Sequence, residues 1–287
     1  MSYPRISLRR NRWAGRIGAD SGVVSILTFG WMALVIIVAL VGPLIAPYSP
    51  NTVDLTNTFA PPSLSHLLGT DETGRDIFSR LIHGTAPSLA GPLLVVVIST
   101  VAGTGLALLA AWFGGRTDTV ISRVLDIMFA FPGLVVAILA VTILGAGFWA
   151  PVLALSLTAI PSIGRILRTE AIRERNMPYV AALIVQGASK WSIAVKHMLP
   201  NLVPTIVVQA TIGFSYALLE LAAISYLGLG IQPPAADWGL MIASGQSSIL
   251  AGHPGQSIFA ATLVVLTVVS TNLIGDRLSE KFEIGER

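Results

Sequence analysis

The sequence predicts an all-α integral membrane protein with six transmembrane helices and both termini in the cytoplasm. Hydrophobic residues make up 53% of the 287 residues and charged residues only 11%, whereas a soluble domain carries roughly 25% charged residues. The apolar residues are concentrated in stretches of about 20, which is the length that crosses a bilayer core about 30 Å thick. The Lys and Arg residues lie mainly on alternate connections between these stretches, a distribution typical of membrane proteins.

The first predicted membrane helix, residues 23–46, has no charged residue and follows a basic N-terminal tail, residues 1–22. A basic start followed by an apolar stretch is also typical of a secretory signal. However, this stretch is longer than the apolar part of a signal, and the residues from Leu44 to Pro47 make a poor cleavage site. We therefore predict that the helix is retained and that the tail is cytoplasmic.

The connection after this helix, residues 47–86, is predicted to lie outside the cell. It begins with a proline-rich part and continues with a segment patterned as a helix. Asp71 or Thr73 could cap this short helix, and its apolar residues share one face: Ile77, Phe78, Leu81 and Ile82. We expect the helix to lie on the outer surface or over the mouth of a pore.

Five further spans are predicted after this connection. They cover residues 87–113, 119–144, 148–165, 202–230 and 256–275 and form one membrane domain, residues 87–275, which a cytoplasmic tail follows at residues 276–287. Because proline has no N–H and its ring clashes with the preceding turn, Pro132 and Pro161 should kink or end a helix. Gly103, Ala107 and Ala111 form a row of small residues, which predicts ordinary close packing between helices.

The orientation follows from the basic residues. Sixteen of the 18 Lys and Arg residues lie in the two tails, around residues 114–123 and in the segment 165–201. The alternate connections hold only Arg75 and Arg80. Positive charge is retained on the cytoplasmic side, so both termini and the segment 165–201 are predicted to be cytoplasmic.

The segment 165–201 is too charged to span a membrane, and its pattern predicts a helix, a glycine turn and a second helix. Asn176 can cap the first helix, and Pro178 suits its first turn. Gly187 then supplies the left-handed position that ends a helix. The apolar residues of this first helix should face a partner or the end of the helix bundle: Tyr179, Val180, Leu183 and Ile184.

The second helix of this segment is predicted at residues 190–198. Ser189 can cap its start, and Pro200 should stop it. The two short helices would then project from the membrane between the fourth and fifth spans.

This segment resembles the EAA loop of ABC-importer permeases, whose pattern is E-A-A-x3-G-x9-I-x-L-P. Ala182 and Gly187 match the alanine at the second position of the motif and the glycine, and Leu199 and Pro200 match the final pair. Ala181 replaces the glutamate of the motif, which removes a charged contact but not the docking helix itself. The stretch KHMLPN, residues 196–201, resembles the form found in dipeptide, oligopeptide and nickel permeases.

Three other stretches, residues 67–84, 227–239 and 272–278, resemble signatures of the second permease of such importers, and the similarity covers about residues 25–280. Residues 85–89 depart from the pattern, since relatives usually carry an arginine-containing stretch there. The resemblance implies the type I ABC importer transmembrane fold. It also implies that the chain forms half of a translocation pore for dipeptides or oligopeptides in the cell membrane of a prokaryote.

The resemblance further implies partners: a homologous permease that completes a heterodimer, two ATP-binding subunits and an extracytoplasmic substrate-binding protein. The helix and turn over residues 176–190 would dock on an ATP-binding subunit. The coupling residues implied are Pro178, Tyr179, Val180, Ala181, Ala182, Gly187, Ala188 and Ser189. Import of nickel or of another small solute, such as glutathione, is the alternative within this family.

The sequence gives no sign of catalytic chemistry. It contains no G-x-x-x-x-G-K-[ST] phosphate-binding loop and no H-E-x-x-H zinc motif. The four histidines are scattered without the spacing of metal ligands: His66, His83, His197 and His253. We therefore predict a transport subunit with no cofactor and no nucleic-acid partner, in which ATP and Mg²⁺ are bound by the partner subunits. An ion-coupled secondary transporter or a membrane-embedded hydrolase are the alternatives from other classes.

Two acidic residues fall inside predicted spans, where a charge costs about 2.5–3.5 kcal/mol and usually faces protein or water. Asp126 lies three residues after Arg123, so a helical ion pair is favoured over a role in the translocation path. Glu220, with Ser215 and Tyr216 nearby, could face the path and meet the amino terminus of a peptide. It could equally pair with the partner permease.

Asp237 and Trp238 lie in a predicted outer connection after two prolines. They are candidates for contact with the extracytoplasmic binding protein. The alternative is that Trp238 anchors the end of a helix at the membrane interface, as tryptophan often does.

Overall fold

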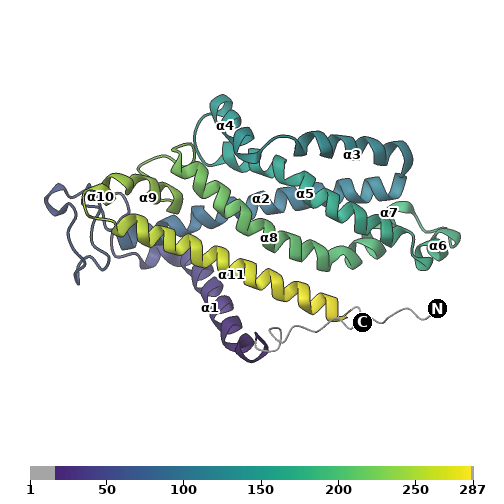
Figure 1. Ribbon diagram of the computed structural model, residues 1–287, viewed down its shortest axis with the longest axis horizontal. Helices are drawn as coiled ribbons and strands as arrows, with labels where there is room; N and C mark the ends of the chain where they lie inside the picture. Colours follow the sequence, from purple (N-terminus) through teal and green to yellow (C-terminus); the bar gives the residue numbers. More distant parts are fainter. Residues whose placement is uncertain (1–16, 286–287) are drawn as a thin grey trace, which may run out of the picture.

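A computed structural model describes residues 17–285 of the chain, and within this range every regular element is helical. The basic residues predicted for the N-terminal tail, from Arg5 to Arg16, lie outside the described residues. Four long helices run side by side along the molecule, and a fifth crosses them at an angle near one end (Figure 1). The long helices are α2 (Ile77–Phe113), α5 (Trp149–Arg175), α8 (Leu199–Tyr226) and α11 (Gly255–Gly285), and the crossing helix is α1 (Ile17–Ile45).

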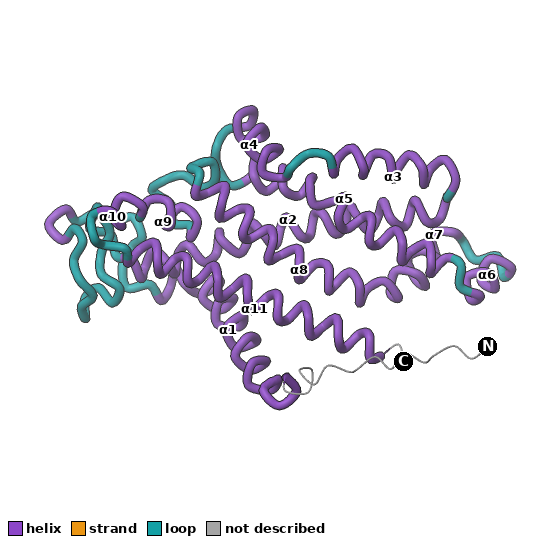
Figure 2. The backbone as a smooth tube through the Cα atoms, in the orientation of Figure 1, coloured by secondary structure: helices purple, strands orange, loops and turns teal. Residues whose placement is uncertain are grey.

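The shorter helices are α3 (Gly115–Phe129), α4 (Gly133–Leu144), α6 (Pro178–Val185), α7 (Lys190–Ser192), α9 (Trp238–Ser244) and α10 (Gln246–Leu250). The long connections gather at one end of the bundle, called here the loop end, which comprises residues 46–76 and 227–254 (Figure 2). The opposite end, called here the α6 end, comprises residues 176–198 and the helix ends that they contact.

Within the described residues, five helices are long and apolar enough to cross a membrane, and α3 and α4 together make a sixth, broken span. The predicted count of six is therefore compatible with the structure. Pro132 separates α3 from α4, whose axes differ by 81°, so the predicted kink at this proline is confirmed. By contrast, α5 continues through Pro161, and the alternative prediction that a helix ends there is wrong.

The start of α2 differs from the prediction. The helix begins at Ile77, ten residues before the predicted span, and continues through Pro87 and Pro92. Its cap is neither Asp71 nor Thr73 but Asp76, whose carboxylate accepts a hydrogen bond from the Ser79 amide at 2.7 Å.

The apolar residues of this first part of α2 explain why it does not form a separate surface helix. Ile77 and Leu81 are buried and pack in one core cluster with Val35 of α1 and Val264 of α11. Burial of such side chains stabilises the fold by about 1.5–3 kcal/mol each. The predicted short helix on the outer surface is therefore wrong, because its apolar face belongs to the bundle core.

The centre of the bundle is the pairing of α2 with α5, which share the most extensive contact between two helices in the described chain. At Gly103 the helices approach so closely that an added Cβ atom would lie 3.0 Å from the amide nitrogen of Gly164. Ala107 and Ala111 on the same face of α2 are also buried. The predicted close packing along this row of small residues is confirmed.

Candidate coupling surface and translocation cavity

The candidate coupling helix, α6, begins with Pro178 at its first position, where a missing N–H is tolerated. The residue that caps it is Met177, through its extended backbone and without a side-chain hydrogen bond. Asn176 instead ends α5, with its amide bonded to the carbonyl of Arg173 at 3.2 Å. The prediction that Asn176 caps the first helix is therefore wrong, because its backbone still belongs to the preceding helix.

The turn after α6 agrees with the prediction. Gly187 has φ +78°, a left-handed conformation that side chains disfavour. Its amide donates to the Ile184 carbonyl at 3.0 Å, and the next amide, of Ala188, donates to the Leu183 carbonyl at 3.1 Å. This pattern closes a helix end. Ser189 then caps α7, since its hydroxyl accepts a hydrogen bond from the Ser192 amide at 3.2 Å.

The second predicted helix, residues 190–198, does not stop at Pro200. A π-helical stretch, Ile193–Met198, joins α7 to α8, so that the chain is helical from Lys190 to Tyr226. Pro200 lies in the first turn of α8. Pro200 has no N–H to donate to the hydrogen bonds of an α-helix. A π turn, in which the hydrogen bonds span one more residue, comes directly before it.

The two faces of α6 have different environments. Val180 is fully buried and packs against Trp112, Ile193 and Met198, and Tyr179, Leu183 and Ala188 pack partly against the same cluster. On the other face, Ala181, Ala182 and Ile184 are exposed, and Val185 is 88% exposed. One half of the predicted apolar face therefore contacts the bundle, and the other half is exposed.

Two residues that the sequence analysis missed hold the start of α6. Glu174 of α5 accepts a hydrogen bond from the Tyr179 hydroxyl at 2.6 Å and another from the Asn201 amide at 2.5 Å. Burial, followed by the hydrogen bond to Glu174, raises the pKa of Tyr179 to about 12. The phenol therefore stays protonated and remains a donor at neutral pH. The spacing of a tyrosine five residues after a glutamate is too common a pattern to have indicated this contact.

A cavity of about 450 Å³ lies beside the α3–α4 break, between α2, α5 and α8. Of the residues predicted for the translocation path, Glu220 and Tyr216 line it. Ser215 does not, because its buried hydroxyl points to α11 and bonds the Val268 carbonyl at 3.4 Å.

Asp126 does not line the cavity either, and its predicted partner is wrong. Its carboxylate pairs with Arg165 of α5 at 2.8 Å rather than with Arg123 of its own helix. The side chains of Asp126 and Arg165 are both about half exposed, at 53% and 54%. The Arg165 guanidinium also lies over the Phe129 ring, 4.8 Å from its centroid.

The rest of the cavity lining was not predicted. It includes aromatic side chains at the break and polar side chains on α2, α5 and α8: Phe129, Phe131, Ser99, Thr158, Ser162 and Gln209. Besides the acidic Glu220 within a span, Pro132 gave the signal for this site in the sequence, because it marks the break beside the cavity.

The candidate binding-protein contact is contradicted by burial. Asp237 and Trp238 are only 6% and 1% exposed. The Asp237 carboxylate caps α9 and accepts a hydrogen bond from the Ser88 hydroxyl at 2.8 Å, and the Trp238 ring donates to the Leu81 carbonyl at 3.2 Å. Both residues therefore fix α9 against α2, and neither presents a surface to a partner.

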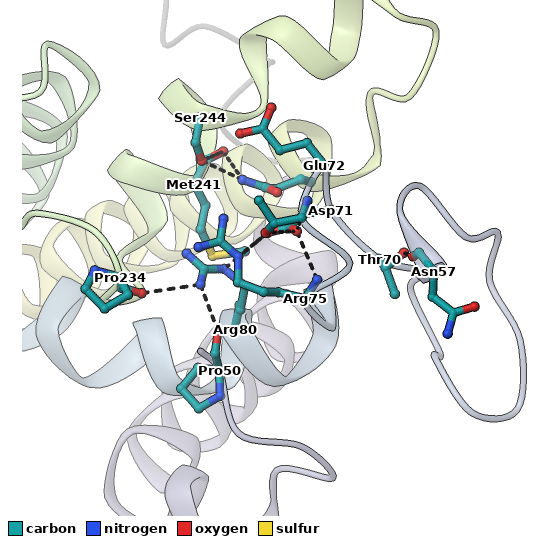
Figure 3. A network of polar contacts seen from close by, with 12 residues as sticks. Pro50, Asn57, Thr70, Asp71, Glu72, Arg75, Arg80, Pro234, Met241 and Ser244 are labelled. Atoms are coloured by element: carbon teal, nitrogen blue, oxygen red, sulfur yellow. Dashed lines mark hydrogen bonds and ion pairs between the residues drawn. The ribbon is translucent and has the colours of Figure 1, made fainter. Parts of the chain in front are cut away.

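The loop end is held by a second buried polar network, centred on Asp71 (Figure 3). The Asp71 carboxylate accepts a hydrogen bond from the Arg75 guanidinium at 2.7 Å and from the Thr73 amide at 2.8 Å. Burial alone would raise the pKa of Asp71, but the hydrogen bonds from Thr73 and Arg75 outweigh it and lower this pKa. Arg80, which is 2% exposed, donates to the carbonyls of Pro50 and Pro234 at 2.8 and 3.4 Å.

No group of three His, Asp or Glu side chains in residues 17–285 is arranged to hold a metal ion. The ionisable side chains at the two ends are instead engaged in structural contacts such as those of Asp71 and Glu174. The coupling surface and the cavity are the candidate functional features of the described chain.

Comparison with known proteins identifies the family. The family model described as "Binding-protein-dependent transport system inner membrane component" matches residues 103–284. The model described as "N-terminal TM domain of oligopeptide transport permease C" matches residues 25–62.

Curated relatives cover most of the chain. The di/tripeptide transport system permease protein DppC of Pseudomonas aeruginosa is 39% identical over 259 residues, which is 88% of this chain and 85% of the relative. The probable D,D-dipeptide transport system permease protein DdpC of Escherichia coli is 36% identical over 249 residues, which is 87% of this chain and 83% of the relative. The glutathione transport system permease protein GsiD of Pectobacterium atrosepticum is 35% identical over 254 residues, which is 88% of this chain and 84% of the relative.

Among solved structures, an inward-facing conformation of the MetNI methionine ABC transporter matches with a TM-score of 0.55 at 20% identity. The match covers 70% of this chain and 95% of that one. This likeness confirms the predicted type I ABC importer transmembrane fold. Because the first family model matches more than half of this chain, the chain belongs to the family of binding-protein-dependent transport system inner membrane components.

Proposed function

We propose that this protein is one permease subunit of an ATP-driven importer of dipeptides or oligopeptides in the inner membrane of a prokaryote. The names of the relatives support the substrate class, since they transport dipeptides, tripeptides or glutathione. The distribution of Lys and Arg supports an orientation with both termini and the α6 end in the cytoplasm. The loop end then faces outward, where the substrate-binding protein delivers its cargo.

The observation that carries this proposal is the environment of α6. The helix is fixed to the bundle through Val180 and the Tyr179–Glu174 hydrogen bond, while Ile184 and Val185 are exposed. Exposed apolar side chains beside a rigid helix end are typical of a protein–protein contact. In this proposal α6 docks on one of two ATP-binding subunits. These subunits bind ATP and Mg²⁺, so this chain is not itself an enzyme.

Movement of α6 would reach the membrane through the continuous helix from Lys190 to Tyr226. That helix carries Tyr216 and Glu220 on the wall of the cavity. A homologous permease would close the open side of the cavity, so that the two chains together form the path. A ligand-driven change of this kind requires ATP to favour one arrangement of the bundle over the other.

Glutathione is a second candidate substrate, and the similarity to the glutathione permease GsiD favours it. It is itself a small peptide, so the same cavity chemistry would serve. Uptake of labelled dialanine and of labelled glutathione by the complete importer distinguishes the two.

The test of the proposal is assembly and coupling. The chain, co-expressed with its partner permease, ATP-binding subunits and binding protein, should co-purify with the ATP-binding subunits and import peptide only with ATP. Gly187→Asp should lower both association and uptake, because a side chain strains the turn and redirects α6. Intact association and uptake in Gly187→Asp would remove α6 from this role. Transport by the purified chain alone, driven by an ion gradient, would overturn the proposal as a whole.

A further inference from the structure

The cavity beside the α3–α4 break contains a single charged group. Its lining is otherwise aromatic, aliphatic or neutral polar, and Glu220 is the only carboxylate among the lining residues, which include no Lys, Arg or His. Ligand pockets usually combine an apolar wall with a few placed polar groups and measure about 300–1,000 Å³. The volume of about 450 Å³ falls in this range.

Glu220 has no cationic partner in the described chain. None of the ion pairs or side-chain hydrogen bonds formed by residues 17–285 involves its carboxylate. The other acidic residue of the spans predicted from the sequence, Asp126, is already paired with Arg165. Glu220 lies on α8, six residues before the end of this candidate membrane-crossing helix. A charged carboxylate inside a membrane span costs free energy unless it contacts water, a cation or a hydrogen-bond donor.

The α3–α4 break leaves room for that partner. Gly133 begins α4, and a Cβ atom added to it would lie 3.6 Å from Oε1 of Glu220 and 3.3 Å from Oγ1 of Thr158. The carboxylate and the hydroxyl therefore flank one point at the edge of the cavity. Tyr216, one turn before Glu220 on α8, lines the same cavity and is 66% exposed.

From this arrangement we infer that Glu220 binds the α-ammonium group of the cargo peptide as the peptide passes through the cavity. The α-amino group has an ordinary pKa of about 7.7–8.0 and is mostly cationic at neutral pH. Thr158 supplies a further acceptor for the ammonium, and the aromatic residues Phe129, Phe131 and Tyr216 contact the peptide side chains without selecting among them. This inference rests on the proposed peptide substrate and adds the group by which the permease recognises it.

The experiment uses the absence of cysteine from this chain. Thr158→Cys places one thiol at the cavity wall in the complete importer, reconstituted in nanodiscs. Its modification is followed by mass spectrometry of this chain with a cationic and an anionic methanethiosulfonate reagent. A carboxylate a few ångströms away attracts the cationic reagent. The ratio of the cationic to the anionic modification rate should therefore be at least about tenfold higher at this thiol than at a free thiol in solution. Glu220→Gln should abolish this preference.

Protection of the same thiol tests the ligand. Dialanine should slow the modification, whereas N-acetyl-dialanine, which lacks the ammonium, should require about tenfold higher concentration or more, as expected for loss of a charged hydrogen bond. In Glu220→Gln the two peptides should protect equally, and Glu220→Asp should retain part of the difference. Glu280→Gln on the exposed end of α11 is the matched control and should change neither result.

Three results would overturn the inference. The first is equal protection by both peptides in the Thr158→Cys importer, and the second is an unchanged difference when Glu220→Gln is added to it. The third is loss of the partner permease from the Glu220→Gln complex, which would place Glu220 at the interface between the two permeases. An importer that hydrolyses ATP but takes up no peptide would instead contradict the proposed function. The protection assay needs no transport and would still decide the role of Glu220.

Discussion

The loop end and the α6 end of the bundle are stabilised in opposite ways. At the loop end, polar side chains are buried and bonded to one another, as Asp71 is to Arg75 and Asp237 is to Ser88. At the α6 end, a short helix is attached by an apolar cluster around Val180 and by the hydrogen bond of Tyr179 to Glu174, and its other face exposes Ile184 and Val185. In Figure 1 the connections fold back on the helices at the loop end, whereas α6 projects beyond them at the other end.

In the proposed function, this contrast separates a region that is held by contacts within the chain from one that docks on a partner. Buried polar groups stabilise a fold when they are satisfied, and at the loop end Asp71 and Asp237 find donors within the chain, although Nε of Arg80 and the Ser248 hydroxyl have no hydrogen-bond partner among the described residues. In the proposed function, the exposed apolar face of α6 is covered by another protein. Variants at the loop end should therefore change stability, and variants on α6 should change association.

Arg80→Ala should cause the largest loss of stability. The substitution removes a buried cation close to Asp71 and the donor to the carbonyls of Pro50 and Pro234, and breaking such a buried network costs about 3–5 kcal/mol. Thermal unfolding of the purified complex in detergent measures it. Arg165→Ala is the control, because its pair with Asp126 is half exposed and such pairs contribute about 0–1 kcal/mol. Equal losses in the two variants would contradict the contrast between the ends.

Val185→Asp should cause the largest loss of association. An aspartate on the exposed face of α6 would place a charge in the proposed ATPase contact, where central residues contribute about 2 kcal/mol or more, or some thirtyfold in affinity. Stability should be unchanged, because Val185 is 88% exposed. Co-purification of the ATP-binding subunit at increasing salt measures the effect. Val53→Asp makes the same change at an exposed valine of the loop end and should leave that association intact.

Gly187→Ala and Gly228→Ala form a matched pair across the two ends. The glycines have φ +78° and +76°, follow α6 and α8, and have no atom within 4 Å of an added Cβ. Each substitution should cost about 1–2 kcal/mol through backbone strain alone. ATPase stimulation by the loaded binding protein should fall only in Gly187→Ala. A similar fall in Gly228→Ala would show that strain at any helix end impairs transport.

Ser189→Ala should have the smallest effect. It removes the hydroxyl that accepts from the Ser192 amide, a cap worth about 1 kcal/mol. Faster hydrogen exchange of the amides in residues 190–192 would report the loss. Ser192→Ala, inside the same turn, keeps the cap and should exchange at the parent rate; faster exchange there as well would assign the effect to the turn rather than to the cap.

Local signals in the sequence predicted much of this structure. Long uncharged stretches predicted the spans, Pro132 predicted the break, and Gly187 and Ser189 predicted the turn and the cap beside α6. Each of these depends on the chemistry of one residue or on composition over about 20 residues. A single sequence contains this information without reference to the rest of the fold.

The errors arose where several groups, near or distant in the chain, compete for one residue. Asp71 has the chemistry of a helix cap, but Arg75 and Thr73 occupy its carboxylate, and Asp76 caps α2 instead. Asp126 has a suitable partner three residues away and pairs with one 39 residues away. The cavity itself could not be predicted, because its walls come from α2, α5 and α8 and its position depends on how they pack.

The contact between Gly103 and Gly164 limits the motions that are open to this protein. At the crossing of Gly103 and Gly164, neither glycine has a side chain to place between α2 and α5, so that little at this point could rearrange and let one helix slide past the other. We therefore expect this pair to keep its geometry in every state of the transport cycle and to act as a fulcrum. The displacement would then be a tilt of α8 and of the broken span against a fixed pair of helices.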